Sequence, residues 1–200
     1  MKKSLGYEIF MTALVLVIIA GIAGALLGLV NHFTEVSAED MIARKASAVY
    51  DGELKPYVSP EGLASPIEYV GGDVIRVFES KTQKGVYVLE AKGEGAYKGS
   101  LELLVNITDG RITKIAKYDA NETPGLGSKA LEDKHFEQYY GKPITPEFKG
   151  FLFVKGPANP ASDEVSAVTG ASKSSTAVNN AVNAAVKWYQ ERILKRGVKQ

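Results

Sequence analysis

An uninterrupted apolar run near the N-terminus constrains this chain more than any other feature. Residues 9–30 form a run of 22 residues without a charged side chain. A helix of that length rises about 33 Å, enough to cross a hydrocarbon core of about 30 Å, so we expect one helix spanning the lipid bilayer. A cleaved signal peptide is the alternative, because Val36-Ser37-Ala38 loosely matches a processing site. Signal cores are usually shorter, however, at about 7–15 residues.

The charges that flank the span predict its orientation. Lys2 and Lys3 precede it, whereas three acidic residues follow it within residues 35–40. The excess of positive charge is typical of the cytoplasmic side. We therefore expect a single-pass protein of the cytoplasmic (inner) membrane, with a cytoplasmic N-terminus and an extracytoplasmic soluble domain. The spacing of Gly24 and Gly28 would let a partner helix approach closely, although glycine is also common in membrane helices generally.

Charge and composition exclude several classes of function. With 24 basic and 23 acidic residues the net charge is +1, which gives no basic surface for a nucleic acid. The chain has no cysteine, so disulfides, thiolate metal sites and iron–sulfur clusters are excluded. Its two histidines, His32 and His135, are far apart in sequence, and we expect no histidine metal site. Carboxylates could still hold a hard cation.

Hydrophobic periodicity predicts an α+β fold, with an antiparallel sheet and a C-terminal packing helix after the transmembrane helix. Residues 34–50 are predicted to form a lead-out helix, that is, a helix leading from the membrane span to the soluble domain. The proline- and glycine-rich stretch 52–72 is predicted to be a loop. We expect helices over residues 131–140 and 174–194 and strands over residues 74–79, 86–91, 101–107, 111–118 and 148–154. The predicted organisation is an N-terminus and anchor (1–35), a lead-out helix and loop (36–72) and a cofactor-binding domain (73–200).

One candidate site is the run of small and hydroxyl residues just before the last predicted helix. It contains Thr169, Gly170, Ala171, Ser172 and Lys173. Serine and threonine are preferred helix caps, so capping alone would explain the run. A helix N-terminus also offers free N–H groups and the positive end of a dipole to a phosphate, and Lys173 could add charge. The two interpretations are compatible.

A second candidate site is the glycine loop that follows the last strand of the predicted sheet. It contains Glu122, Thr123, Pro124, Gly125, Leu126 and Gly127. The residue before a proline favours an extended backbone, and the glycines allow a ligand to approach closely. Alone, the loop reads as an ordinary connection from a strand to a helix.

Taken together, in this order and spacing, the two segments resemble the FMN-binding domain of two related subunits. These are the G subunit of Rnf-type ion-translocating ferredoxin:NAD oxidoreductases and the C subunit of sodium-translocating NADH:quinone reductases. The resemblance covers nearly the whole chain, including the uncharged span. The glycine-rich stretch 93–99 and the intact loop 122–127 look closer to the Rnf G subunit.

The resemblance implies that Ser172 carries FMN through a phosphoester, at a position where the family usually has threonine. Loop 122–127 would then lie beside the flavin, with Glu122 or Thr123 as polar partners and Leu126 against the ring. A separate flavin transferase, using FAD and a divalent cation, would attach the cofactor. The chain would be an electron-carrier subunit, not catalytic alone, and its partners would be the other subunits of a membrane redox complex coupled to ion transport.

The match departs from the family at one further position. Ser166 stands three residues before Thr169, where the family commonly has an aspartate. Two alternatives stay open: another extracytoplasmic flavin electron carrier, such as the quinone reductase subunit, or a flavin-free membrane-anchored assembly module, which the departure at Ser166 brings into consideration. An anchored hydrolase has little support, because no Ser/His/Asp order or nucleophile elbow is present.

Overall fold

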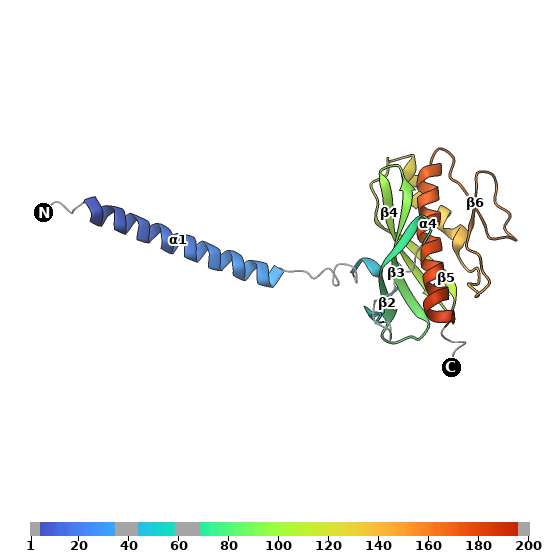
Figure 1. Ribbon diagram of the computed structural model, residues 1–200, viewed down its shortest axis with the longest axis horizontal. Helices are drawn as coiled ribbons and strands as arrows, with labels where there is room; N and C mark the ends of the chain where they lie inside the picture. The colour runs from blue at the N-terminus through green and yellow to red at the C-terminus, as the bar shows by residue number, and fades with distance from the viewer. Residues whose placement is uncertain (1–4, 35–43, 59–68, 196–200) are drawn as a thin grey trace. The chain divides into compact units, whose positions relative to one another are not determined.

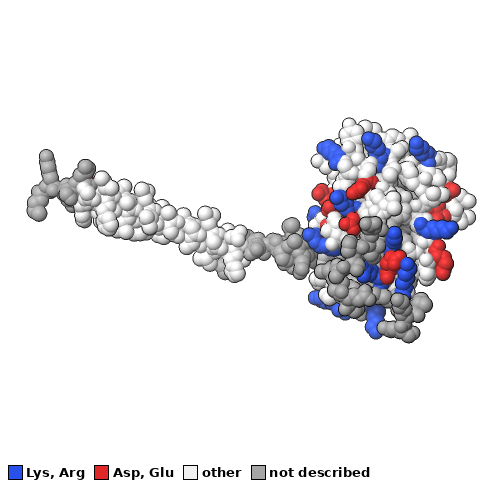
Figure 2. All heavy atoms as spheres, in the orientation of Figure 1, with Lys and Arg blue, Asp and Glu red and all other residues white. Residues whose placement is uncertain are grey.

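The computed structural model describes residues 5–34, 44–58 and 69–195, in two compact units, Met1–Ile42 and Ala43–Gln200. The described part of the first unit is a single helix, α1 (Leu5–Thr34), shown in blue in Figure 1. Within it, Gly6–His32 is long and apolar enough to cross a membrane, and its side chains are not buried by protein. Figure 2 shows charged side chains on the second unit, while the visible surface of α1 is uncharged. The predicted N-terminal apolar helix is confirmed.

The second unit is built on a five-stranded antiparallel sheet whose strands follow one another in chain order. They are β1 (Leu54–Pro56), β2 (Gly72–Ser80), β3 (Val86–Ala96), β4 (Gly99–Thr108) and β5 (Arg111–Asp119). In the middle of the sheet, Leu89 lies opposite Val105, which lies opposite Ile115, and all three are buried. Asp109 and Gly110 both have positive φ and make the turn between β4 and β5.

One long helix, α4 (Ser172–Tyr189), packs against this sheet and completes the predicted α+β fold. Its apolar positions recur every three or four residues and all lie in the core: Val178, Ala181, Val182, Ala185, Val186 and Tyr189. Gly93 on β3 lies under the helix, where a Cβ atom would overlap with the backbone carbonyl of Ala177. The glycine therefore sets how closely α4 approaches the sheet. A π-helical turn, η3 (Gln190–Leu194), extends α4 to the predicted end of this helix.

Residues 44–50 are held to the sheet by specific contacts. Ala46 and Val49 are buried, and the buried side-chain amide of Asn106 on β4 donates a hydrogen bond of 2.9 Å to the carbonyl of Val49. The ammonium group of Lys45 lies 4.2 Å from the centre of the Tyr118 ring. The predicted lead-out helix lies partly outside the described residues, in 35–43, but the part that is described contributes to the fold of the second unit.

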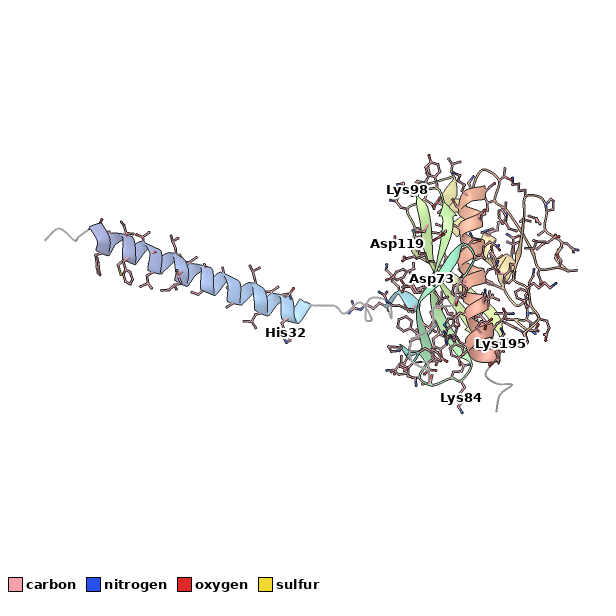
Figure 3. The ribbon with its side chains drawn as sticks, viewed as in Figure 1. His32, Asp73, Lys84, Lys98, Asp119 and Lys195 are labelled. Carbon is pink, nitrogen blue, oxygen red and sulfur yellow. The ribbon has the colours of Figure 1, made fainter. Side chains whose placement is uncertain are left out.

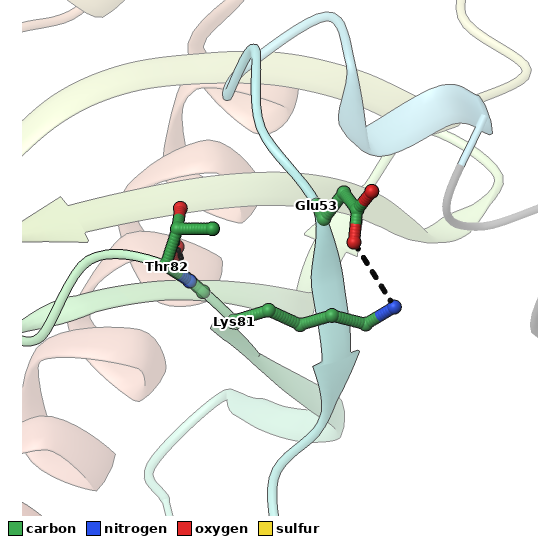
Figure 4. A network of polar contacts seen from close by, with 4 residues as sticks. Glu53, Lys81 and Thr82 are labelled. Carbon is green, nitrogen blue, oxygen red and sulfur yellow. Dashed lines mark hydrogen bonds and ion pairs between the residues drawn. The ribbon is translucent and has the colours of Figure 1, made fainter.

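The structure corrects the predicted loop over residues 52–72, because β1 lies within it. This strand pairs with β2 at the edge of the sheet, where a proline is tolerated. Glu53 and Lys81 tie its start to the end of β2 through a backbone hydrogen bond and an ion pair of 3.3 Å (Figure 4). Both side chains are exposed, so the ion pair adds little stability.

The predicted helix over residues 131–140 is wrong as a single element. It is replaced by three short pieces: η1 (Gly127–Leu131), α3 (Asp133–Phe136) and η2 (Glu137–Tyr139). The break falls at Glu132, whose backbone is extended. Gly141 follows the last piece with a φ of 75°, as expected for the residue after a helix.

The strand predicted over residues 148–154 is confirmed only at its end, as β6 (Leu152–Val154). It pairs in parallel with β7 (Glu164–Ser166), a strand the sequence analysis missed, in a separate two-stranded sheet. The backbone of Phe151 explains why the strand starts late. Its N–H and carbonyl are bonded to the side chain of Asn183 on α4, so they are not available to a neighbouring strand.

Candidate functional site

The two candidate segments meet at one pocket of about 560 Å³, within the usual size range of small-molecule sites. Eight of the eleven predicted site residues line it: Glu122, Thr123, Leu126, Gly127, Gly170, Ala171, Ser172 and Lys173. Pro124, Gly125 and Thr169 belong to the same segments but do not line it. Two further lining residues, Tyr97 and Ser174, were not among the predicted site residues. The pocket therefore joins three segments that are far apart in sequence.

The first turn of α4 forms one wall of the pocket. Ala171 is the N-cap residue, and no side chain caps the helix. The first intrahelical bond runs from the N–H of Ser175 to the carbonyl of Ala171, which leaves the N–H groups of the preceding turn without helical acceptors. The expectation that a serine or threonine side chain caps α4 is therefore wrong. An uncapped helix start in a pocket is suited to an anionic group.

The three serines of this turn differ in what their hydroxyl groups can do. Ser172 is exposed and lines the pocket, and its hydroxyl makes no hydrogen bond with the described part of the chain. Ser174 is 2% exposed and donates a hydrogen bond of 2.5 Å to Oε2 of Glu122. Ser175 is fully buried, and its Oγ accepts a hydrogen bond from the N–H of Val168. Of the three, only the hydroxyl of Ser172 is free to react with a ligand in the pocket.

The glycine loop forms the opposite wall, and Glu122 ties it to the helix through Ser174. Gly127 lies against this contact, because a Cβ atom there would come within 2.6 Å of the Ser174 hydroxyl and closer still to the Glu122 carboxylate. Gly125 has a φ of 75° and donates its N–H to Oγ of Ser128, so it shapes the loop from outside the pocket. The loop is recognisable in the sequence, but the contact between Glu122 and Ser174 is not.

Tyr97 approaches the pocket from the turn between β3 and β4. Figure 3 shows the neighbouring Lys98 at the end of the unit where this turn lies. The ring centre of Tyr97 is 6.0 Å from the ammonium group of Lys173, which connects the turn to the start of α4. Only the glycine-rich composition of residues 93–99 marked this segment in the sequence, and composition does not show which side chain faces a pocket.

Ser166, the position where the family commonly has an aspartate, does not line this pocket. It lies in β7, where its Oγ accepts a hydrogen bond from the N–H of Ala158 and its own N–H donates to Gln138. It lines a different pocket of about 460 Å³, together with His135 and Gln138. The serine is thus a structural part of β7 and is separate from the walls described above.

Comparisons with known proteins agree with this geometry. The model of the FMN-binding domain family matches residues 96–187, which include Tyr97, the glycine loop and the start of α4. The G subunit of the Na⁺-translocating ferredoxin:NAD⁺ oxidoreductase complex of Acetobacterium woodii is 31% identical over 194 residues, covering 91% of this chain and 92% of the relative.

Two further matches are shorter or more distant. The G subunit of the proton-translocating ferredoxin:NAD⁺ oxidoreductase complex of Clostridium ljungdahlii is 36% identical over 110 residues, covering 52% of this chain and 56% of the relative. The crystal structure of NqrC from Shewanella oneidensis matches with a TM-score of 0.52 at 18% identity, covering 76% of this chain and 91% of that one. At that identity the match shows a shared fold.

Proposed function

Because this chain belongs to the family of G subunits of ion-translocating ferredoxin:NAD⁺ oxidoreductase complexes, we propose that it is an electron-carrying subunit of such a complex, with FMN as its cofactor. FMN supplies the redox chemistry when bound, and the protein supplies binding and orientation. The observation that carries the proposal is the exposed hydroxyl of Ser172 at an uncapped helix start inside a pocket.

The residues of the pocket fit a flavin mononucleotide. The phosphate is an anion, and the first turn of α4 offers it N–H groups, the positive end of the helix dipole and the cation of Lys173. Gly127 and Gly170 keep the walls free of side chains, while Leu126 gives an apolar surface for a ring. We propose Glu122 and Thr123 as polar partners of the flavin and place no catalytic acid or base in the pocket.

We further propose that FMN is joined covalently to Ser172 by a phosphoester. A separate flavin transferase would move the FMN phosphoryl group from FAD to Oγ of Ser172. The bond between the two phosphates of FAD breaks, AMP leaves, and the serine loses its proton. Ser174 and Ser175 are not competing acceptors, because both hydroxyls are buried and hydrogen-bonded. A covalent bond keeps the cofactor on a domain outside the cytoplasm, where a dissociated flavin would be diluted.

The orientation of the anchor belongs to the same proposal. Lys2 and Lys3 precede the apolar helix, and the acidic residues come after it, so the N-terminus lies in the cytoplasm and Ala43–Gln200 lies outside. The other subunits of the redox complex are the proposed partners of the anchor and the domain. A flavin-free assembly module is the competing function, and the departure at Ser166 is the feature that favours it.

The test is the intact mass of the full-length protein, purified from membranes of a host that contains the transferase. The expected mass exceeds that of the chain by one FMN less one water. Ser172→Ala should remove this adduct, Ser172→Thr should keep it, and Ser47→Ala, an exposed serine outside the pocket, should leave it unchanged. If the adduct survives Ser172→Ala, FMN is attached at another residue and the assignment of Ser172 is wrong. If the native protein has no adduct, the flavin-free assembly module is favoured.

A further inference from the structure

The glycine-rich stretch between β3 and β4 is a feature that the proposed attachment site does not explain. Gly95 and Gly99 have φ values of 95° and 105°, and the pairing of β3 with β4 shifts register between Glu94 and Ala96. A bulge and two left-handed glycines make a sharply bent turn that few other sequences can adopt. Tyr97 lies in the middle of this turn.

The bent turn presents Tyr97 to the pocket instead of to the core. Tyr97 is 69% exposed, although burial of a tyrosine ring usually stabilises a fold. Its ring lies beside the ammonium group of Lys173, the residue directly after Ser172. Among the described residues that line the pocket, Tyr97 is the one aromatic side chain.

A second large apolar side chain, Leu126, flanks the same position from the other wall. It is 55% exposed and lies over Gly170, where a Cβ atom would be 4.0 Å from its Cδ2 atom. Tyr97 and Leu126 thus come from two different turns and stand next to the two ends of the segment Gly170 to Lys173. A flat ring system attached to Ser172 would have one aromatic and one aliphatic side chain of the pocket wall near it.

We propose that Tyr97 is the aromatic platform of the pocket and that its ring stacks on the isoalloxazine of the FMN carried by Ser172, with Leu126 on the opposite side. This inference rests on the proposed function and assigns a role to a residue outside the two attachment segments. The ammonium group of Lys173, 6.0 Å from the ring centre of Tyr97, places the ring near the start of α4. Tyr97 is a positioning residue, because it orients the flavin and makes no bond to it.

Stacking on a phenol has an optical consequence that stacking on a benzene ring lacks. A tyrosine in contact with an excited flavin donates one electron to it and takes it back on recombination, so emission is quenched without net oxidation or reduction. Phenylalanine has the same stacking surface but is too poor a donor to quench. The pair Tyr97→Phe and Tyr97→Ala therefore separates contact with the ring from the chemistry of the hydroxyl group.

The experiment measures flavin fluorescence of the full-length holoprotein in mild detergent, first folded and then unfolded in guanidinium chloride. The ratio of the two signals corrects for flavin content. We expect strong quenching in the native protein and a several-fold rise of the folded signal in Tyr97→Phe and Tyr97→Ala. The rotational correlation time of the flavin, measured by time-resolved anisotropy, should fall only in Tyr97→Ala, because that variant alone loses the platform.

Tyr50→Phe is the matched control. Tyr50 bonds to Ser80, at the end of β2 remote from the turn between β3 and β4, and does not line the pocket. Its fluorescence ratio should equal that of the native protein. If Ser172 carries FMN and Tyr97→Phe is as strongly quenched as the native protein, the platform is refuted while the attachment site stands. If the native protein carries no FMN, the proposed function fails and the platform fails with it.

Discussion

The hydrogen bond between Ser174 and Glu122 is the contact that joins the glycine loop to α4, and its removal gives a quantitative prediction. Ser174→Ala removes a donor that is 2% exposed and bonded to a carboxylate at 2.5 Å. A hydrogen bond to a charged group contributes about 1.5–3 kcal/mol when buried. Glu122 is only partly buried and lines an open pocket, so water can replace part of the lost contact. We therefore expect a loss of about 1–2 kcal/mol in the free energy of unfolding.

A double-mutant cycle isolates the contact from the effects of each substitution alone. Glu122→Gln keeps an acceptor but removes its charge, and should cost about 1 kcal/mol. The double variant should cost little more than Ser174→Ala, since the second change has no donor left to weaken. This gives a coupling energy of about 1 kcal/mol between the two positions. If the losses of unfolding free energy in the two single variants add up to that of the double variant within about 0.3 kcal/mol, the two side chains do not interact. That result would refute the contact between Ser174 and Glu122.

The assay uses the single tryptophan of the chain, Trp188, which is buried in α4 and lies 5.2 Å from the ring of Tyr57. Its fluorescence reports unfolding of the second unit in urea, even though α1 stays in the detergent micelle. The protein is produced without the transferase, so that no flavin absorbs the emission. Ser47→Ala serves as the control and should change stability by less than about 0.5 kcal/mol.

Two further predictions concern the anchor and the one histidine of the second unit. A C-terminal reporter after Gln200 that works only outside the cytoplasm should be active, and one that works only in the cytoplasm should be silent; the reverse pattern would overturn the orientation. Burial lowers the pKa of His135 to about 4, below its unfolded value of about 6.5. Only the unfolded chain binds the proton between these values, so stability is full above about pH 6.5 and falls toward pH 4. The urea midpoint should fall less from about pH 7 to pH 5 in His135→Asn, and an equal fall would contradict this assignment.

The long, regular elements could be predicted from the sequence because α4 packs against the sheet along its length. This packing requires apolar residues at regular spacing. The positions from Val178 to Tyr189 repeat at helical spacing, and all of them face the sheet. Strands β2 to β5 contain runs of β-branched, aromatic and other apolar residues, and Asp109 and Gly110 mark a turn whose positive φ values suit these two residue types. These local preferences agree with the tertiary structure.

The elements that the sequence did not predict correctly depend on side chains from elsewhere in the chain. The late start of β6 follows from Asn183, which bonds to the backbone of Phe151 from α4. The strand β7 is only three residues long and exists because β6 lies beside it. The break at Glu132 has no marker such as proline or glycine. For β6 and β7 the deciding partner lies elsewhere in the chain, so local periodicity carries no information about it.

The candidate site could be predicted only in part, because its motifs are local in the sequence and the contacts between them are not. The two segments were recognisable as motifs, and eight of their residues line one pocket. What the sequence could not give was the contact that joins them, since Glu122 and Ser174 are 52 positions apart. Tyr97 was equally hidden, because an aromatic residue in a glycine-rich turn can be buried or exposed, and only the bend of the turn decides which.

The places of the three serines in the first turn of α4 explain why one of them is available for modification. Successive residues of a helix are rotated by about 100°, so Ser174 and Ser175 lie on the side that also contains Val178, Ala181 and Val182. That side faces the sheet, and the packing of the whole helix fixes it there. Ser172 is rotated by about 160° from Ser174 but by only about 60° from the buried Ser175, so the phase of the helix alone does not expose it. It is the first residue of α4 and lies at the end of the helix that lines the pocket. The exposure of its hydroxyl therefore depends on where α4 begins as well as on which side of α4 packs on the sheet.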